Sequence, residues 1–585
     1  MVKRTQCLWL KLLAAMILVL SVTFAAFAGN VPTTPKKPHD VYAKNGMVSA
    51  AHELASKPGI EIMKRGGNAI DAAAATAFAL NVVEPYNIGM GGGGFVTVRF
   101  AKTGEVQYVD FREVAPASAR KDMYASDQAK KEGWSARGGK SAGVPGFVAG
   151  WFFILEKYGT MPFAEVVKPA LKLAEDGYVW TEGQTGTLQG SYYEDLYNLN
   201  DEGRNVPYFE EGLPRRAGTV VKHPGLAKAF RLLAKDGAKA FYNGPIGEAL
   251  VKAVNDHGGN MTMQDLANFK VVVKKPVEGT YRGYRIYSSA PPSSGGAHVI
   301  QLLNFMENFE VSKMKQTSPE LFDMWGKAER MVFADRDRYM ADTAFVDVPL
   351  EGITSKAYAK EMFKKFDINA KLPKLEKPGD PWKFDKTNKK SSHIGDTGHE
   401  HFSTTHFSTV DKEGNIVAAT NTINYWFGSK VMVPGYQIFV NNQMDDFSSN
   451  PTSVNAPEPG KKPLSSMSPT IILDPQGRSF MTLGAAGSRM ILTIVAQVIS
   501  NVIDHKMTMS EAIEAPRIWT DMEGETILEA TAGHEVIDAL RKKGYELNTE
   551  ETYHGVCQGI IFDHEKNIMD AGADQRTGTG MPEGF

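Results

Sequence analysis

Two short polar stretches contain the residues best suited to chemistry. They read Thr404-Thr405-His406-Phe407-Ser408 and Thr420-Asn421-Thr422-Ile423-Asn424. Alternate residues of a β-strand share one face, so Thr420, Thr422 and Asn424 are expected to point the same way. A hydroxyl group becomes a useful nucleophile only when a nearby base takes its proton. Threonine is also an ordinary strand residue, and the local pattern on its own favours a plain structural hairpin.

The loop between the two stretches determines how they pair. Residues 411–415 (DKEGN) have turn composition, so the flanking residues 404–410 and 416–424 are predicted to be the strands of a β-hairpin. A loop of five residues sets the register, and counting back along both strands places Thr404 opposite Thr422. A bulge in either strand would shift this pairing.

The residues before this hairpin are unusual in composition. Lys371–Lys390 contains seven lysines and three prolines, and residues 393–402 show no helix or strand pattern. Residues from about 371 to 403 are therefore predicted to form a solvated, mobile tail. Long loops are uncommon inside compact domains, which points to a functional reason for this one.

Histidines at 393, 399, 401 and 406 raise the question of a metal site. Their setting is the predicted tail and the start of a strand, and the string His399-Glu400-His401-Phe402-Ser403 lacks the H-E-x-x-H spacing of a zinc-binding helix. Neither a metal nor another cofactor is predicted.

The elements before the tail alternate between helix-like and strand-like stretches. Asn68–Val83 is predicted to be a helix of small residues, and Phe163–Asp176 and Leu226–Lys235 are predicted to be amphipathic helices. Phe95–Phe100 and Val106–Arg112 are predicted to be strands.

A glycine run at Gly89–Gly94 formally fits the G-x-G-x-x-G pattern of dinucleotide-binding loops. Such a loop must follow a strand and open a helix, whereas here a helix precedes the run and a strand follows it. The run is therefore predicted to be a turn whose backbone packs closely against a neighbouring segment.

The N-terminus is predicted to be a signal peptide. Basic residues precede an apolar run over 12–28, which ends in the small-x-small sequence Ala26-Phe27-Ala28. A membrane anchor is the alternative, but the run is short for a membrane span. Residues 1–28 are predicted to be removed, and the mature chain to be exported to the periplasm or secreted without stable membrane insertion. Cys7 leaves with this segment, so Cys557 has no partner for an intrachain disulfide.

Length and composition set the class of protein. A chain of 585 residues is long for one core, which predicts two domains or one large layered α/β body. Hydrophobic residues make up 42% and charged residues 23%, the mix of a soluble globular protein. A net charge of −2, without a basic stripe carrying interleaved aromatics, argues against a nucleic-acid partner.

A series of motifs over nearly the whole mature chain resembles the γ-glutamyltranspeptidase (γ-glutamyltransferase) family of N-terminal-nucleophile hydrolases. The motifs are GGNAIDAAAATAFALNVVEP with the glycine run, DFREVAP, VPG at 144–146, APPSSGG at 290–296, TTHFSTVD, TNTIN, NNQMDDFS and PLSSMSPT. The resemblance implies a mixed α/β fold, an αββα four-layer sandwich. It also implies that one precursor supplies a large subunit, 29–403, and a small catalytic subunit, 404–585, which stay associated.

The same resemblance implies self-cleavage between Ser403 and Thr404. Thr404 would attack the Ser403 carbonyl, pass through an ester and become a new N-terminus. Its α-amine, with a pKa of about 7.7–8.0, would then serve as the general base for its own hydroxyl. Thr422 would orient Thr404. By chemistry alone Thr405 is a rival nucleophile, but the family pattern and the register both favour Thr404.

The resemblance further implies how a γ-glutamyl substrate is held. Arg112 would grip its α-carboxylate, since a guanidinium binds a carboxylate with two hydrogen bonds. The other predicted substrate-binding residues are the serine pair Ser465 and Ser466 for the carboxylate, and Asn424, Gln443 and Asp446 for the α-ammonium.

Two places depart from the family pattern. Ala486 and Gly487 stand where the family commonly has two glycines, and their backbone N–H groups are predicted to stabilise the oxyanion. The segment between Phe447 and Ser465 looks short where some bacterial members carry a lid loop. A more open pocket that admits larger γ-glutamyl substrates is therefore predicted.

The predicted activity is a two-step transfer of a γ-glutamyl group from glutathione or a related γ-glutamyl amide. The acceptor is water, an amino acid or a peptide. One alternative within the superfamily is a poly-γ-glutamate depolymerase or a cephalosporin (glutaryl) acylase. An alternative of another class is a non-catalytic exported binding protein on the same scaffold.

Overall fold

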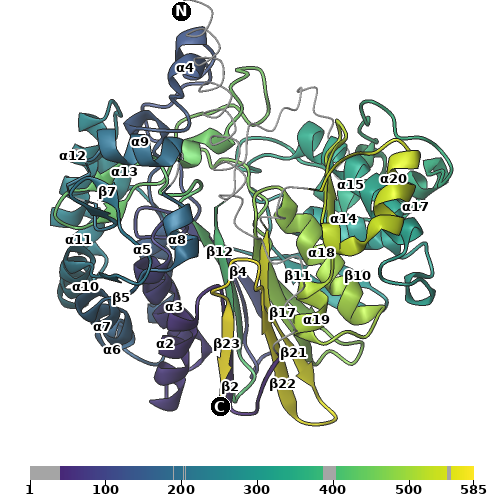
Figure 1. Cartoon of the computed structure of the whole chain (residues 1–585), viewed down its shortest axis with the longest axis horizontal. Helices are drawn as coiled ribbons and strands as arrows, with labels where there is room; N and C mark the ends of the chain where they lie inside the picture. The colour runs from purple at the N-terminus through teal and green to yellow at the C-terminus, as the bar shows by residue number, and fades with distance from the viewer. Residues whose placement is uncertain (1–39, 189, 202, 205, 387–402, 550–554) are drawn as a thin grey trace, which may run out of the picture. The chain divides into compact units, whose positions relative to one another are not determined.

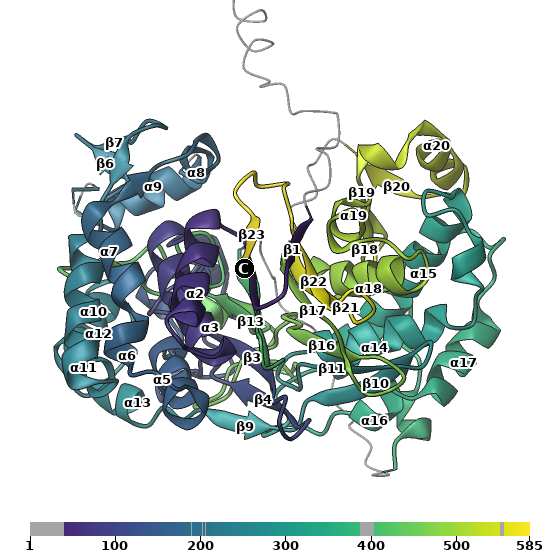
Figure 2. The ribbon, with the colours of Figure 1, turned by 90° about the horizontal axis from the view of Figure 1, so that it is seen from below.

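The computed structural model describes most of the chain outside its N-terminal segment. The described residues are 40–188, 190–201, 203–204, 206–386, 403–549 and 555–585. Two seven-stranded sheets lie face to face, and helices cover the outer face of each (Figures 1 and 2). This is the αββα sandwich that the family resemblance implied. The predicted signal peptide lies outside the described residues, and within them no helix is long and apolar enough to cross a membrane.

The first sheet contains the predicted hairpin, and its strand order is β23-β2-β12-β13-β3-β4-β9. Its strands are β2 (Gly46–Ala50), β3 (Gly93–Arg99), β4 (Val106–Asp110), β9 (Val272–Lys274), β12 (Thr405–Asp411), β13 (Ile416–Thr422) and β23 (Met581–Gly584). Thr405 pairs with Asn421 and Val410 with Ile416, so the register predicted for the hairpin is confirmed. Every residue of β12 and β13 is buried, because the sheet has a layer on both faces.

The second sheet has the strand order β1-β22-β21-β17-β16-β11-β10. Its strands are β1 (Val41–Ala43), β10 (Val277–Tyr281), β11 (Tyr284–Ser288), β16 (Thr470–Leu473), β17 (Ser479–Ala486), β21 (Val556–Asp563) and β22 (Ile568–Ala573). Strands β12 and β13 pack against β17, so the hairpin lies between the helices on one side and the second sheet on the other.

A chain of polar side chains joins the two sheets. The ring nitrogens of His406 lie 2.8 Å from the Thr420 hydroxyl and 3.1 Å from the Ser408 hydroxyl, which in turn lies 3.2 Å from Thr482 of β17. Burial lowers the pKa of His406 to about 3, so the ring is neutral. His406 is the one of the four histidines considered for a metal site that lies among the described residues. Those residues contain no group of His, Cys, Asp or Glu side chains that could hold a metal ion.

The helices over the first sheet include α2 (Glu53–Lys64), α3 (Ala69–Val83) and α5 (Phe147–Tyr158). All residues of α3 are buried, because its small side chains let it pack against α2 and the sheet together. Asn68 and Asp71 form a capping box that starts α3 at the predicted position.

Of two further helices predicted over this sheet, one is divided in the structure and one is continuous. The predicted helix 163–176 is wrong as a single element, because it divides into α6 (Phe163–Val166) and α7 (Lys168–Asp176). Pro169 favours a new helix start and cannot continue the hydrogen-bond ladder of a preceding one. The predicted helix 226–235 is confirmed as α10 (Pro224–Asp236).

The helices over the second sheet include α14 (Gly295–Met306), α15 (Pro319–Tyr339), α17 (Lys356–Lys365), α18 (Met490–Ile503), α19 (Met509–Glu514) and α20 (His534–Lys542). Helix α18 is buried along its whole length and packs on β17, and α14 packs on β10 and β11. The remaining α-helices of the described residues are α4 (Asp127–Glu132), α8 (Glu182–Gly186), α9 (Ser191–Asn198), α11 (Lys239–Tyr242), α12 (Pro245–Asp256), α13 (Met263–Ala267) and α16 (Leu350–Ile353). The smaller strands are β5 (Tyr178–Val179), β6 (Phe209–Glu210), β7 (Leu213–Pro214), β8 (Val220–Val221), β14 (Met432–Val433), β15 (Ile438–Phe439), β18 (Ile518–Thr520), β19 (Glu525–Leu528) and β20 (Glu546–Asn548).

The lysine-rich stretch predicted as a mobile tail is described over residues 371–386. Most of its side chains there are exposed, as predicted for a solvated segment. Its backbone is nevertheless anchored to α15: Arg330 donates to the Pro373 carbonyl at 2.6 Å, and the Gly379 N–H donates to Asp335 at 2.8 Å. The first part of the predicted tail is therefore docked on the body.

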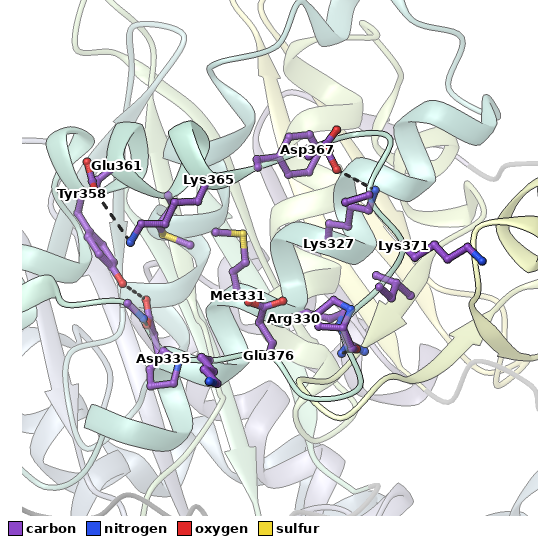
Figure 3. A pocket seen from close by; sticks show the side chains of 18 residues that line it. Lys327, Arg330, Met331, Asp335, Tyr358, Glu361, Lys365, Asp367, Lys371 and Glu376 are labelled. Carbon is purple, nitrogen blue, oxygen red and sulfur yellow. Dashed lines mark hydrogen bonds and ion pairs between the residues drawn. The ribbon is translucent and has the colours of Figure 1, made fainter.

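A cavity of about 390 Å³ lies between α15, α17 and this docked stretch (Figure 3). Asp335, Arg330 and Glu376 face it, and the Tyr358 hydroxyl donates to Asp335 at 2.7 Å. The rest of the predicted tail, 387–402, lies outside the described residues.

Candidate active site

Thr404 stands immediately before β12, at the end of the hairpin. Its hydroxyl donates to Oγ1 of Thr422 at 3.1 Å, and the backbone N–H of Asn424 donates to the same oxygen at 2.9 Å. The two hydroxyls therefore lie together, as the register of the hairpin predicted. The amide side chain of Asn424 points elsewhere and donates to the Asn442 carbonyl at 3.0 Å.

The backbone at Thr404 is strained. Its φ of 147° is rare for any residue with a side chain and especially for a β-branched one. On the other side of the junction, the Ser403 hydroxyl donates to the Tyr86 carbonyl at 3.2 Å and to Oδ1 of Asn87 at 3.0 Å. The Ser403–Thr404 peptide bond is thus held between two anchored residues in a conformation that cleavage would relax.

A cavity of about 270 Å³ opens beside this peptide bond. Ser403 and Thr404 line it from the hairpin, and Ala486 and Gly487 line it from the end of β17. The other lining residues are Glu84, Tyr86, Asn87, Thr181, Gly183, Gln184, Thr187, Trp426, Val556, Arg576, Thr577 and Thr579. The predicted nucleophile and the predicted oxyanion donors therefore face one space.

The Ala486–Gly487 pair makes different demands at its two positions. Ala486 ends β17 in ordinary extended pairing with Val556, so its side chain imposes no strain. Gly487 has a φ of 130°, and a Cβ there would lie 2.6 Å from the Cα of Gly555. Glycine is required at the second position and not at the first, which explains how an alanine fits where the family commonly has glycine.

A second cluster lies where β4 ends. Arg112 is 1% exposed, and its Nη2 donates to Oδ2 of Asp446 at 2.5 Å and to the Leu464 carbonyl at 2.6 Å. Gln443 donates its side-chain amide to the same Asp446 oxygen at 2.5 Å. Three of the predicted substrate residues thus form one buried, charge-neutralised group.

The predicted serine pair is tied to the helices over the second sheet. The Ser465 carbonyl accepts from the N–H of Ser294 at 2.7 Å, and the Ser465 hydroxyl accepts from the N–H of Met467 at 3.2 Å. Arg336 of α15 donates to the Ser466 hydroxyl at 3.0 Å. Arg336 belongs to none of the motifs, so local sequence carried no signal for this contact.

A continuous path links the two clusters. It runs from Thr404 to Thr422, on to Asn424 and Asn442, and through the neighbouring Gln443 to the Arg112–Asp446 pair. In the described part of the chain, none of the six predicted substrate residues lines the 270 Å³ cavity. Thr404 therefore stands between the two regions, with the cavity on one side and the buried ion pair on the other.

The glycine run at Gly89–Gly94 packs directly against the segments that carry this path. A Cβ at Gly92 would lie 2.1 Å from the Thr422 carbonyl oxygen, and one at Gly91 would lie 2.1 Å from that of Phe439. Asn441, which was not predicted as a site residue, donates to the Gly91 carbonyl at 2.7 Å. The run is a turn that packs closely against its neighbours, as predicted. Because Gly91 and Gly92 have no side chains, the backbone carbonyls of Phe439 and Thr422 can approach them, and Thr422 belongs to the candidate site.

Buried charges also hold the segment between Phe447 and Ser465. Lys462 donates to Asp110 at 2.6 Å, and the N–H of Arg112 donates to the same carboxylate oxygen at 3.0 Å. Burial tends to raise the pKa of Asp110, but the charges of Lys462 and Lys274 outweigh it, so this pKa is lowered. The Lys462 end of the segment is therefore anchored directly behind Arg112.

Known proteins resemble this chain over most of its length. The sequence model of the family described as gamma-glutamyltranspeptidase matches residues 55–582. The glutathione hydrolase proenzyme of Escherichia coli K12 is 37% identical over 562 residues, covering 94% of this chain and 93% of that protein. The acylase ACY 1 proenzyme of Pseudomonas sp. SE83 is 35% identical over 554 residues, covering 94% of this chain and 95% of that protein.

Solved structures place the fold in the same group. The cephalosporin acylase from Bacillus halodurans superposes with a TM-score of 0.82 at 27% identity, covering 96% of this chain and 99% of that one. The γ-glutamyltranspeptidase of Helicobacter pylori superposes with a TM-score of 0.54 at 39% identity, covering 58% of this chain and 96% of that one. The family match over most of the chain, together with these relatives, shows that the protein belongs to the γ-glutamyltranspeptidase family.

Proposed function

We propose that the protein is a self-processing γ-glutamyl transferase and hydrolase. It cleaves the γ-glutamyl amide bond of glutathione and related compounds through an ester on Thr404, and passes the acyl group to water, amino acids or peptides. The observation that carries this proposal is the position of Thr404, with its hydroxyl 3.1 Å from that of Thr422 and a cavity shared with the Ala486–Gly487 backbone.

The first reaction is self-cleavage. Oγ1 of Thr404 attacks the Ser403 carbonyl carbon, the C–N bond breaks, and an ester with a free Thr404 amine remains. Water hydrolyses this ester to the Ser403 carboxylate and the Thr404 hydroxyl. In the uncut chain the Thr404 nitrogen is an amide, so it becomes a base for turnover only after this step. The strained φ of 147° at Thr404 supports a junction that gains from being cut.

The two products would stay together after cleavage. Strand β12 pairs with β2, and β13 pairs with β3, so two central strands of the small fragment lie between strands of the large one. Separating the fragments would break both ladders and expose the buried faces of the hairpin.

Turnover would use the ion pair as the recognition site. A γ-glutamyl group carries an α-carboxylate and an α-ammonium, which match Arg112 and Asp446 respectively. The substrate would insert between the two and exchange their mutual contact for two new ones. Oε1 of Gln443 is buried and accepts no hydrogen bond within the described part of the chain, so it supplies a further acceptor for the ammonium.

Activity on two substrates separates this proposal from a glutaryl acylase. Glutathione is expected to be hydrolysed at least about 10²-fold faster than a glutaryl amide, because a ligand without the ammonium leaves buried acceptors unpaired. The measurement is kcat/KM of the cut protein for both compounds. Faster hydrolysis of the glutaryl amide would assign the acylase alternative instead.

Substitutions at Ala486 and Gly487, the proposed oxyanion-binding pair, give a second test of this function. Gly487→Ala is expected to lower kcat by about 10²–10³-fold, because a Cβ there displaces the backbone N–H from its position. The matched change Ala486→Gly should stay within a few-fold of wild type, since the first position needs no special conformation. The check is steady-state hydrolysis of a γ-glutamyl anilide by each cut protein, and equal activity of Gly487→Ala would exclude the pair as the oxyanion site.

Export is part of the proposal and rests on the sequence of residues 1–28. The basic start, the apolar run and the small-x-small end predict cleavage before Gly29. The N-terminal sequence of the large fragment, purified from the producing cells, tests it. A large fragment that retains residues 1–28 would contradict removal of the signal.

A further inference from the structure

Glu84 lines the cavity beside the bond proposed to be cut. Glu84 is the C-cap of α3, is 3% exposed, and lines the 270 Å³ cavity together with Ser403 and Thr404. Among the described residues it is the one carboxylic acid that lines this cavity. Its Oε2 accepts no hydrogen bond from a described group, and the buried hydroxyl of Thr405 likewise has no hydrogen-bond partner there.

The alternation of β12 places Thr405 on the side of α3. Phe407, two residues on, stacks on Trp151 of α5, and Thr409 donates to the Ala69 carbonyl of α3 at 2.7 Å. Thr404 lies on the opposite face, toward the second sheet. The Thr405 hydroxyl therefore lies on the Glu84 side of the sheet, whereas the Thr404 hydroxyl lies on the other side.

A proton acceptor is needed at this place for a chemical reason. The amine that serves as base in turnover does not exist until the chain has been cut, so another group must take the Thr404 hydroxyl proton first. The leaving Thr404 nitrogen must also gain a proton as its bond to Ser403 breaks. One carboxyl group can perform both transfers.

We propose that Glu84 relays the proton of self-cleavage across the cavity that it shares with Ser403 and Thr404. The Glu84 carboxylate takes up the proton that leaves Thr404 as its Oγ1 bonds to the Ser403 carbonyl carbon. The proton returns to the Thr404 nitrogen as the C–N bond breaks, and the resulting ester is hydrolysed by water. This relay rests on the proposed self-cleavage and adds the group that drives its first step.

The surroundings suit such a relay near neutral pH. Burial raises the pKa of Glu84 to about 7, with the nearby side chains of Thr405 and Asn87 opposing the rise. Two phenols face it, Tyr86 and Tyr178, and burial raises the pKa of both, with the charge of Glu84 adding to the rise.

One cation also lines the cavity. Arg576 donates to Glu529 at 2.6 Å and 2.7 Å and to Asp574 at 3.1 Å, so its charge is balanced by these carboxylates. Because the relay needs the Glu84 carboxylate, the cleavage rate is expected to rise as pH increases through about 7.

The test follows self-cleavage of the full chain after cell-free synthesis, on gels, from pH 5.5 to 9. Glu84→Gln keeps the shape of the side chain and is expected to slow cleavage about 10²-fold and to remove the rise near pH 7. The matched control is Asp335→Asn, another buried carboxyl group whose pKa burial raises to about 6. Asp335 lies on α15 and lines the 390 Å³ cavity (Figure 3), not the 270 Å³ cavity beside the cut. The control should cleave with the wild-type rate and pH profile.

A second arm separates a relay from a purely structural role. Glu84→Ala leaves space beside the cavity, and added formate is expected to restore part of the cleavage rate, which it should not do for Asn87→Ala. Slow cleavage with an unchanged pH profile and no response to formate would overturn the relay. So would wild-type cleavage by Glu84→Gln. Failure of the wild-type chain to cut itself would instead overturn the proposed function.

Discussion

Thr404→Ala is expected to leave a single uncut chain that hydrolyses no γ-glutamyl compound. The change removes the hydroxyl that would attack Ser403, and without the cut no free amine forms to act as the base for turnover. The wild type should instead show two fragments of about 40 and 20 kDa, scaled by residue number. A denaturing gel and an assay on a γ-glutamyl anilide check both outcomes together.

Two further variants make this result specific to the hydroxyl of Thr404. Thr404→Ser keeps a nucleophilic oxygen and should still cut and turn over. Thr405→Val removes the rival hydroxyl on the opposite face of β12 and should still cut at the same bond. Cleavage and turnover by Thr404→Ala would show that another residue is the nucleophile.

Arg112→Gln is expected to remove most of the turnover while leaving self-cleavage intact. Losing one member of a buried, hydrogen-bonded charge pair costs about 2–5 kcal/mol of binding, which is at least about thirtyfold in kcat/KM. Cleavage should continue because Arg112 does not line the cavity beside Ser403 and Thr404. The measurements are fragment formation and kcat/KM for glutathione.

The same variant is also expected to lower stability, which must be separated from recognition. Arg112→Gln leaves the Asp446 charge buried without its partner and should lower the free energy of unfolding by about 3–5 kcal/mol. The double variant Arg112→Gln/Asp446→Asn removes both charges of this pair, so it should regain stability but not turnover. Arg120→Gln is the exposed control, since that side chain is 72% exposed. Full activity of the double variant would exclude the pair from substrate recognition.

The hairpin shows what could be read from sequence. A five-residue turn and the two-residue period of a strand were enough to place Thr404 opposite Thr422, because both are local constraints. The glycine run was likewise correctly predicted to be a closely packed turn, since its order of helix then strand excluded the phosphate-binding alternative.

Contacts between distant segments could not be read in this way. The serine pair contacts Ser294 and Arg336, which belong to other elements, and the Thr422 carbonyl packs against Gly92. The helix and strand patterns of the sequence carry no information about such long-range contacts. The break at Val167 was missed because the apolar pattern continues across it while Pro169 starts a new helix. Glu84 was overlooked because it ends a helix whose composition predicts only packing.

The most direct test of the account is the intact mass and N-terminal sequence of the small fragment. We expect this fragment to begin with Thr404 and to carry a free α-amine, and we expect the large fragment to end at Ser403. A fragment that begins at Thr405 or elsewhere would contradict it, as would an active protein that is never cut.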